Sequence, residues 1–305
     1  MITLLLLSHF HWHRSLMATL VAIFLRLKHK PVMKSRRRAF AYFAKQGNKN
    51  KIKKPRFHTA GLKTFEEKTT FEGDPLLIFN KDSEKAIIYL HGGAYAKNIT
   101  KHHLKMIDKI SKGTSTRIYV PIYKKAPLYC FEDVIPEVVK FYRSIAKNHQ
   151  VILMGDSSGG GMAIALAIRL KELGIKQPER IITLSPWVDV SLAKADPKKI
   201  KYDSMEGING AKVFGEYWAK GDIKNPLVSP VYGDLSNLAP IDIFVGGKEV
   251  LLNDLLDFVE KLKKVNGEYT LDIQPYMGHV YQAYPIKEAK EGINKIVNVI
   301  KGETQ

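Results

Sequence analysis

The sequence is poor in cysteine, since Cys130 is the only one among 305 residues. A single thiol excludes an intrachain disulfide framework and any zinc or iron-sulfur site that needs several cysteines. Such cysteine usage indicates a reducing compartment or a fold that is indifferent to redox state. Internal repeats and low-complexity tracts are also missing. With 45% apolar residues, 22 Gly and 14 Pro, the composition is typical of a packed globular protein.

Acidic residues are missing from the first 65 positions, which hold 15 Lys and Arg before the first acid, Glu66. The whole chain has a formal charge of +18, so only +3 remains on residues 66–305. The basic charge therefore belongs to an N-terminal arm, residues 1–60, and not to the following domain, residues 61–301.

Long hydrophobic runs are missing as well. The arm has two apolar stretches, Ile2 to Leu7 and Leu16 to Leu27, and neither reaches the ~20 residues that a membrane-spanning helix needs. The basic cluster from Lys28 to Lys54 follows the apolar part, whereas a cleaved secretory signal has basic residues first. We expect an amphipathic helix that lies on an anionic membrane surface or packs on the protein's own domain. The cluster would keep that domain in the cytoplasm, at the inner face of the membrane if the arm binds there.

Two other interpretations of the arm have weaker support. His9, His11 and His13 alternate, but no further ligands stand near them, so we expect no metal site. The basic run Arg36 to Arg38 is followed by aromatic residues, as in nucleic-acid-binding proteins, but no recognised motif accompanies it. We therefore expect no nucleic-acid partner.

From about Leu62 onward, short apolar runs typical of buried strands alternate with amphipathic stretches of helix length. The predicted strands are Ala86 to Leu90, Arg117 to Val120, Val151 to Met154, Arg180 to Leu184, Ile241 to Val245 and Tyr269 to Gln274. The predicted helices are His102 to Ser111, Phe131 to Lys147, Gly160 to Leu173, Leu251 to Lys264 and Ile286 to Ile300. This alternation predicts a mostly parallel sheet covered on both faces, with functional groups at the carboxyl ends of its strands. The segment from Asp189 to Leu238 interrupts the pattern and is expected to be an insertion.

A Gly-x-Ser-x-Gly motif lies between a predicted strand and a predicted helix. It runs from Gly155 to Gly159, and this strand, sharp turn and helix are typical of a nucleophile elbow with Ser157 as the nucleophile. The glycines two residues either side of the serine let strand and helix approach closely. Ser158 is the rival nucleophile, but its own frame begins with Asp156 where glycine is needed. The N–H of Ser158 is better suited to stabilise an oxyanion.

A nucleophilic serine needs a base and an orienting acid, which follow it in this architecture in the order acid, then histidine. Of the ten histidines, His279 alone lies after Ser157, directly behind the last predicted strand. For the acid we favour Glu249, which follows the strand that ends at Val245. Asp254 is the competitor, although a place inside the next helix would turn it toward solvent.

Oxyanion donors are expected in the sequence HGGAY, His91 to Tyr95, which follows the predicted strand that ends at Leu90. Glycines there can turn two backbone N–H groups toward one point, so Gly92 and Gly93 are the candidates beside Ser158. His91 precedes the nucleophile in the chain and is expected to anchor this loop. A plain turn is the alternative interpretation.

Six motifs together resemble the hormone-sensitive-lipase-like branch of the α/β-hydrolase esterases. They are HGGAY, GDSSGG, SPWVD, NPLVSP, GGKEVLLND and the late GH, and they stand in that family's order. The resemblance covers roughly residues 62–301 and implies an eight-stranded, mostly parallel sheet. It also implies a helical cap, made from the arm and from the insertion at about residues 189–238.

The resemblance further implies hydrolysis of short- to medium-chain acyl esters through an acyl-serine, without a metal or an organic cofactor. Ala94 replaces the third glycine of the family's HGGG motif. Amide hydrolysis is open to the same catalytic groups. The competing hypothesis is a non-catalytic hydrolase-fold protein that binds a small apolar ligand or a membrane partner. Physiological substrate and oligomeric state are not encoded in recognisable motifs.

Overall fold

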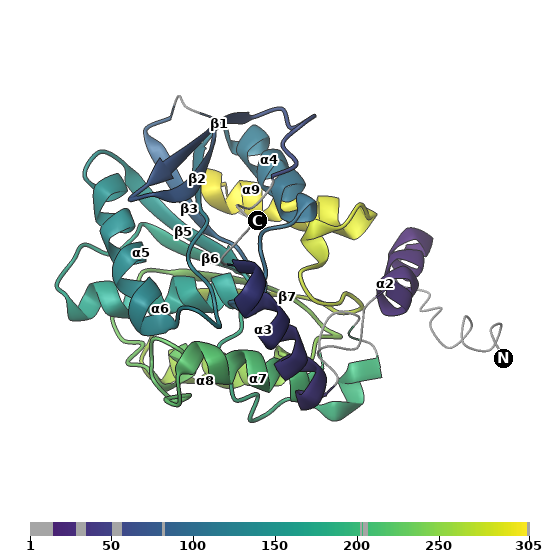
Figure 1. The fold of residues 1–305 in the computed structure, drawn as a ribbon. Coiled ribbons are helices and arrows are strands. Elements are labelled where there is room, and N and C mark those ends of the chain that lie inside the picture. Colours follow the sequence, from purple (N-terminus) through teal and green to yellow (C-terminus); the bar gives the residue numbers. More distant parts are fainter. Residues whose placement is uncertain are drawn as a thin grey trace.

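The protein is built around one eight-stranded sheet with helices on both faces (Figure 1). The computed structural model describes residues 15–28, 35–50, 57–80, 83–201, 203 and 207–303. The predictions for Ile2 to Leu7 and for His9, His11 and His13 lie outside these residues. The structure confirms the predicted sheet, which is mostly parallel and is covered by helices on both faces.

The strand order in the sheet is β1-β2-β4-β3-β5-β6-β7-β8. The first two strands form an antiparallel hairpin, and β2 also pairs antiparallel with β4, whereas all other pairs are parallel. The strands are β1 (Phe65–Phe71), β2 (Asp74–Phe79), β3 (Lys85–Leu90), β4 (Arg117–Pro121), β5 (Gln150–Asp156), β6 (Arg180–Leu184), β7 (Ile241–Gly246) and β8 (Tyr269–Gln274). All six predicted strands are present, and the hairpin β1-β2 is an addition.

Alternate residues of each central strand enter different layers of the core, as the pleat of a strand requires. In β3, Ile87 and Tyr89 pack with α4 and α9, while Ile88 and Leu90 pack with α5 and α6. Both faces of the strand are therefore buried, which explains its unbroken apolar sequence. The helices that cover the sheet are α4 (Lys101–Thr114), α5 (Phe131–Ala146), α6 (Ser158–Glu172), α8 (Leu252–Lys264) and α9 (Lys287–Lys301).

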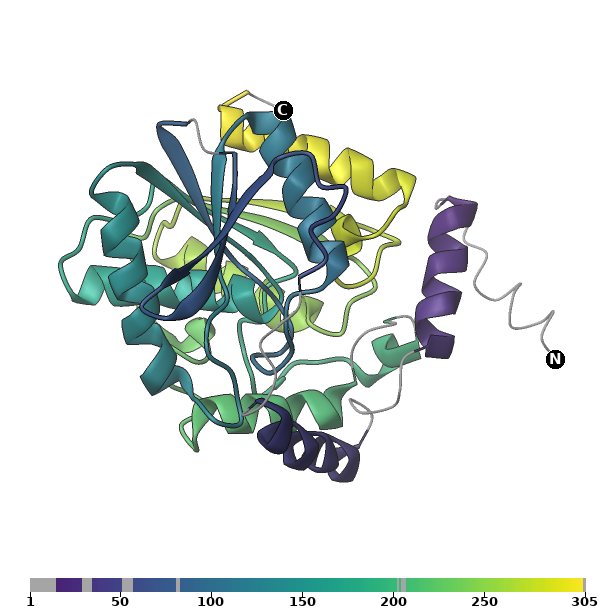
Figure 2. The same ribbon diagram turned by 45° about the horizontal axis from the view of Figure 1, so that its top comes forward.

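The arm and the insertion meet over one edge of the sheet. The insertion contains α7 (Ile208–Ala219), whose bounds residue patterns did not predict although the resemblance implied a helical cap here. Helix α3 (Arg36–Asn50) of the arm lies beside α7 in Figures 1 and 2. Phe43 of α3 packs on Phe214 of α7 with 4.4 Å between ring centroids. Arg36 and Glu216 form a two-pronged ion pair at 2.7 Å, so both apolar and polar contacts fix α3 on the insertion.

The other helix of the arm, α2 (Leu16–Lys28), lies apart from α3 at the side of the molecule near α9 (Figures 1 and 2). Its buried Ala18 packs in a small apolar cluster with Met277, Tyr281 and Ala289. Among the described helices, none combines the length and the hydropathy that crossing a bilayer requires. The arm thus reaches the body of the protein at two separate places.

Candidate active site

Ser157 occupies the sharp turn between β5 and α6. Its backbone has φ 52° and ψ −122°, a strained conformation for a residue with a side chain. The turn is held from both sides, because Ser157 N–H donates to the carbonyl of Leu184 at 2.8 Å and its own carbonyl accepts from Trp187 N–H at 2.9 Å. The strained turn places the hydroxyl at the carboxyl edge of the sheet.

The glycines that flank the serine are required by the closeness of the backbones. A Cβ atom on Gly159 would lie 2.0 Å from the carbonyl oxygen of Leu90, and one on Gly155 would lie 2.4 Å from the carbonyl oxygen of Gly159. No side chain fits at either position. The Gly-x-Ser-x-Gly spacing is thus the sequence form of a steric requirement.

The structure brings the three predicted catalytic side chains into one hydrogen-bonded row. Ser157 Oγ lies 2.9 Å from His279 Nε2, and His279 Nδ1 lies 2.9 Å from Glu249 Oε2. Ser157 is 8% exposed, His279 4% and Glu249 0%. A hydroxyl, an imidazole and a carboxylate in this order can deprotonate the hydroxyl as it attacks a carbonyl carbon.

Ser185 is a member of this network that the sequence analysis did not single out. Its hydroxyl donates to Glu249 Oε1 at 2.6 Å and accepts from the N–H of Val280 at 3.0 Å. The N–H of Gly246 donates to the same carboxylate oxygen at 2.6 Å. Ser185 therefore joins the acid to the loop that carries His279. Its only sequence signal is its place behind β6, at the start of the SPWVD motif.

Asp254 is the competing candidate for the acid, and its position inside a helix led us to expect it to face solvent. The structure instead buries it in α8. Its Oδ1 accepts from the backbone N–H of Lys194 at 2.8 Å, while its Oδ2 has no hydrogen-bond partner among the described residues. Burial is the main reason why the pKa of Asp254 rises to about 6, and the nearby Asp189 and Asp257 raise it further. Its contacts join α8 to the insertion, and the histidine's carboxylate partner is Glu249.

The predicted oxyanion donors lie beside the nucleophile, but Gly92 is engaged elsewhere. Its N–H donates to Asp156 Oδ1 at 2.9 Å, so it is not free to bind an oxyanion. The N–H groups of Gly93, Ala94 and Ser158 have no hydrogen-bond partner within the described part of the chain. The backbone N–H groups left available to an oxyanion are therefore those of Gly93, Ala94 and Ser158, whereas that of Gly92 is occupied.

Backbone strain is concentrated in this loop. Ala94 and Tyr95 have φ values of 52° and 58°, and Gly93 has 130°. Consecutive residues in the left-handed region cost about 1 kcal/mol or more each when they carry a side chain. The surrounding contacts must hold the loop in this form, and such strain is common where backbone donors are aimed at a ligand.

Asp156 is the buried residue that holds the loop. Besides the N–H of Gly92 it accepts from Tyr89 Oη at 2.6 Å, and it faces His103 Nε2 at 3.1 Å. Burial alone would raise the pKa of Asp156, but His103 and these hydrogen bonds outweigh it and lower the pKa to about 2. The carboxylate next to the nucleophile thus connects the elbow, the loop and α4.

His91 anchors the same loop from within, as expected. Its Nδ1 lies 2.7 Å from the carbonyl oxygen of Gly92, and its ring stacks on Tyr123 with 4.5 Å between centroids. Burial lowers the pKa of His91 to about 3, and the nearby Lys125 lowers it further, so the ring is neutral. A neutral ring that is wholly buried suits packing and not proton transfer to a substrate.

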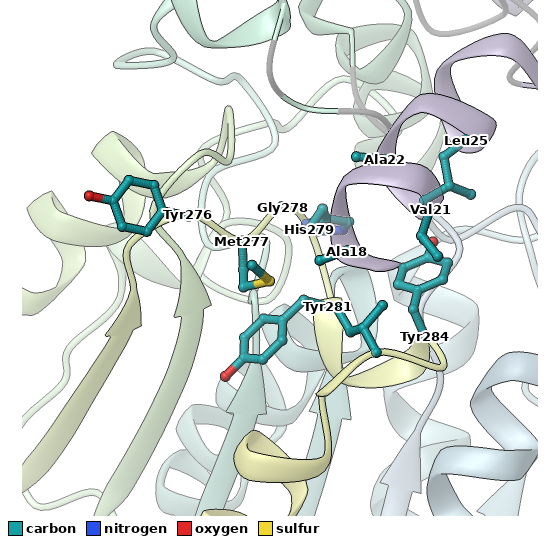
Figure 3. A pocket seen from close by; sticks show the side chains of 11 residues that line it. Ala18, Val21, Ala22, Leu25, Tyr276, Met277, Gly278, His279, Tyr281 and Tyr284 are labelled. Carbon is teal, nitrogen blue, oxygen red and sulfur yellow. The ribbon is translucent and has the colours of Figure 1, made fainter. Parts of the chain in front are cut away.

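A hollow opens beside His279, which we call the His279 hollow. Ala18, Val21, Ala22 and Leu25 of α2 form one wall, and Gly278 and His279 are among the residues opposite (Figure 3). The arm therefore contributes apolar surface beside His279 of the hydrogen-bonded row. Within the described ranges, no group of three or more His, Cys, Asp or Glu residues is placed to hold a metal ion.

Comparison with known proteins gives a consistent result. A family model described as alpha/beta hydrolase fold matches residues 87–283, which include every member of the row. An acetyl-hydrolase of Streptomyces hygroscopicus is 28% identical over 206 residues, covering 66% of this chain and 69% of the relative. An esterase of Acinetobacter venetianus is 27% identical over 219 residues, covering 69% of this chain and 72% of the relative.

A solved structure extends the likeness to nearly the whole chain. The hormone-sensitive-lipase homologue EstE7, from a metagenome library, superposes with a TM-score of 0.78 at 28% identity. The superposition covers 94% of this chain and 98% of EstE7. The likeness therefore includes the arm and the insertion as well as the sheet.

Proposed function

Because this chain belongs to the α/β-hydrolase fold family, in its hormone-sensitive-lipase-like branch, we propose that Ser157, His279 and Glu249 are its catalytic triad. The protein is a carboxylic ester hydrolase, like its relatives named esterase and acetyl-hydrolase. The observation that carries the assignment of the triad is the continuous hydrogen-bonded row from Ser157 Oγ through His279 to Glu249. A non-catalytic ligand-binding protein is not favoured beside these relatives.

The reaction is acyl transfer to water through two tetrahedral intermediates. His279 Nε2 takes the proton of Ser157 as Oγ attacks the ester carbonyl, and Glu249 holds the imidazole in the tautomer that can accept it. Collapse of the intermediate breaks the bond to the alcohol, which leaves with the proton from His279. Water then repeats these steps on the acyl-serine and releases the acid.

The negative oxygen of each intermediate is bound by the backbone N–H groups of Gly93, Ala94 and Ser158. These donors are fixed before the reaction begins, and removal of one such donor costs about 3 to 4 kcal/mol in comparable enzymes. Gly92 has a supporting part, because its N–H ties the loop to Asp156. Ala94 fits this role because a backbone donor does not depend on the side chain.

The substrates are short- to medium-chain acyl esters, and the arm and the insertion form the cap over the site. The packing of α3 on α7 supports such a cap, because residues far apart in the sequence form one aromatic cluster. The walls supplied by α2 to the His279 hollow support an apolar part of the substrate site. The domain itself is then formed by residues 61–301.

The basic arm binds an anionic membrane surface and keeps the protein in the cytoplasm, at the membrane's inner face. The support is the imbalance of charge, since 15 Lys and Arg stand in the first 65 residues without an acid. Binding through charge predicts sedimentation with anionic vesicles that is strongest at low salt and weakens as salt is added.

The decisive test is hydrolysis of nitrophenyl esters from acetyl to palmitoyl by the parent protein and by Ser157→Ala. We expect the variant to lose more than about 10⁴-fold in kcat, because the residual rate rests on binding and oxyanion stabilisation alone. A variant that hydrolyses these esters at the parental rate would overturn the proposal and favour a non-catalytic protein.

A further inference from the structure

Helix α2 presents a continuous apolar face to the outside of the molecule. Leu16 is 60% exposed, Met17 52%, Leu20 49% and Phe24 56%. A helix turns about 100° per residue, so these four side chains fall within an arc of about 100°. We call this arc the outer face of α2.

The opposite side of the same helix lines the His279 hollow. Ala18, Val21, Ala22 and Leu25 lie on the other side of the helix and line the hollow together with residues that include His279 and Tyr284 (Figure 3). Ala18 is 5% exposed and packs with Met277 and Tyr281, the neighbours of the catalytic histidine. One helix about 20 Å long thus separates the hollow from whatever meets its outer face.

A carboxylate holds α2 in this position. Glu288 of α9 accepts from the N–H of Ser15 at 2.5 Å and from its hydroxyl at 2.8 Å, at the positive end of the helix dipole. The Ser15 hydroxyl also accepts from the N–H of Ala18 at 3.2 Å and so caps the helix. The outer face is therefore presented by an anchored helix.

The charge of the segment that contains α2 points to a lipid surface and not to a protein groove. α2 belongs to a segment with 15 basic and no acidic residues among positions 1–65. An apolar face on a helix of 13 residues, within a segment that carries basic but no acidic residues, suits the boundary between anionic headgroups and acyl chains.

We propose that the outer face of α2 inserts into an anionic lipid surface and that the His279 hollow takes its substrate from there. The substrate class is then an ester dissolved in the lipid layer, whose acyl or alcohol chain passes along α2 to the hollow. This inference rests on the proposed ester hydrolysis, but its docking step can be measured without catalysis. It differs from attraction by charge alone, because insertion of apolar side chains persists when salt screens the charges.

The test uses Leu20→Asp and Met17→Asp in the full chain, with Leu173→Asp as the matched control. Leu173, at the end of α6, is 47% exposed and lies outside α2, so a charge there tests the loss of an exposed apolar residue alone. Each protein is sedimented with vesicles of phosphatidylcholine and phosphatidylglycerol in equal amounts, at low and at high salt. Hydrolysis of a long-chain nitrophenyl ester dissolved in these vesicles is then compared with hydrolysis of soluble nitrophenyl acetate.

We expect both α2 variants to lose at least about ten-fold in vesicle partitioning at high salt, and as much in hydrolysis of the vesicle-borne ester. Turnover of soluble nitrophenyl acetate should match the parent, which also shows that the variants fold. The control should behave as the parent throughout. Equal partitioning of the α2 variants and the parent would overturn the inference. The inference would also be overturned if the parent did not bind the vesicles but formed a dimer that the α2 variants disrupt. The outer face would then bind a second copy of the chain.

Failure of the proposed function gives a different pattern. If the parent hydrolyses neither ester but sediments with the vesicles through Leu20 and Met17, the docking surface stands and the catalytic proposal falls. The parent and the α2 variants could also hydrolyse the soluble ester normally and hydrolyse the vesicle-borne ester at equal rates. In that case the outer face does not deliver the substrate, and this part of the inference is wrong.

Discussion

Replacing Ser185 with alanine tests whether this residue supports Glu249, the proposed catalytic acid, in addition to stabilising the fold. The variant removes a hydroxyl that donates to Glu249 at 2.6 Å and accepts from Val280 N–H at 3.0 Å. A hydrogen bond to a charged group contributes about 1.5 to 3 kcal/mol. If losing this hydrogen bond misplaces Glu249 and His279, and the lost energy is added to the activation barrier, kcat falls about ten- to hundred-fold. KM should stay unchanged, because Ser185 is not expected to touch the substrate.

Ser229→Ala is the matched control. Ser229 is as buried as Ser185, and its hydroxyl also makes two hydrogen bonds, to the carbonyl of Ile223 at 2.7 Å and from the N–H of Val190 at 3.0 Å. Urea unfolding should show losses of about 1 to 3 kcal/mol in both variants. Only Ser185→Ala should lose kcat with nitrophenyl butyrate. The reasoning is refuted if Ser185→Ala keeps the parental kcat, or if the control loses as much.

Three further outcomes follow from buried carboxylates. Asp156→Asn removes the charge that faces His103 and loosens the loop of Gly93, so kcat should fall about ten-fold at constant KM; an unchanged kcat would contradict this positioning. The folded state favours the protonated form of Asp254, whose pKa is raised to about 6, so the free energy of unfolding should decline by at most about 3 kcal/mol as pH rises from about 4 to 6. Asp254→Asn should flatten this decline in urea unfolding, and equal slopes would refute the argument. Glu288→Gln should speed hydrogen exchange in α2 about ten-fold, because the neutral amide holds Ser15 less tightly. Glu291→Gln on the same helix is the control, and equal exchange in both variants would mean that Glu288 does not anchor α2.

The hydrogen-bonded row of Ser157, His279 and Glu249 could be predicted because each member is tied to a local pattern. Ser157 stands in a turn whose flanking glycines are required by backbone distances near 2 Å to a hypothetical Cβ. Glu249 and His279 follow neighbouring parallel strands, β7 and β8, and the ends of such strands meet at one edge of a sheet. Strand periodicity and loop position were therefore enough to place three side chains at one edge.

The remaining features depend on contacts that no local pattern encodes. The direction of the Gly92 N–H is set by Asp156, 64 residues away in the chain. Asp254 is buried because the backbone of Lys194 covers it from the insertion. Neither contact leaves a trace in the spacing of residues around the groups that it fixes.

Residue patterns alone did not place helix α7 or the hairpin β1-β2, although the resemblance implied a helical cap and eight strands. For α7 and β1, the local sequence argues against the structure. Helix α7 contains Gly210 and Gly215, each costing about 1 kcal/mol in a helix, and is stabilised by burial of Phe214 and Trp218. Strand β1 alternates half-buried and exposed residues at the edge of the sheet, and its outward face is polar. In both cases tertiary packing decides the structure over local propensity.

The parallel strands β5, β6, β7 and β8 are consecutive neighbours, and each is followed by one member of the network: Ser157, Ser185, Glu249 and His279. A nascent chain therefore has no complete triad until the segment with His279 has left the ribosome and β8 has paired with β7. Ester hydrolysis regained during refolding would time that last pairing, later than the return of helical circular dichroism. We therefore expect no ester hydrolysis by the nascent chain until its synthesis has passed His279.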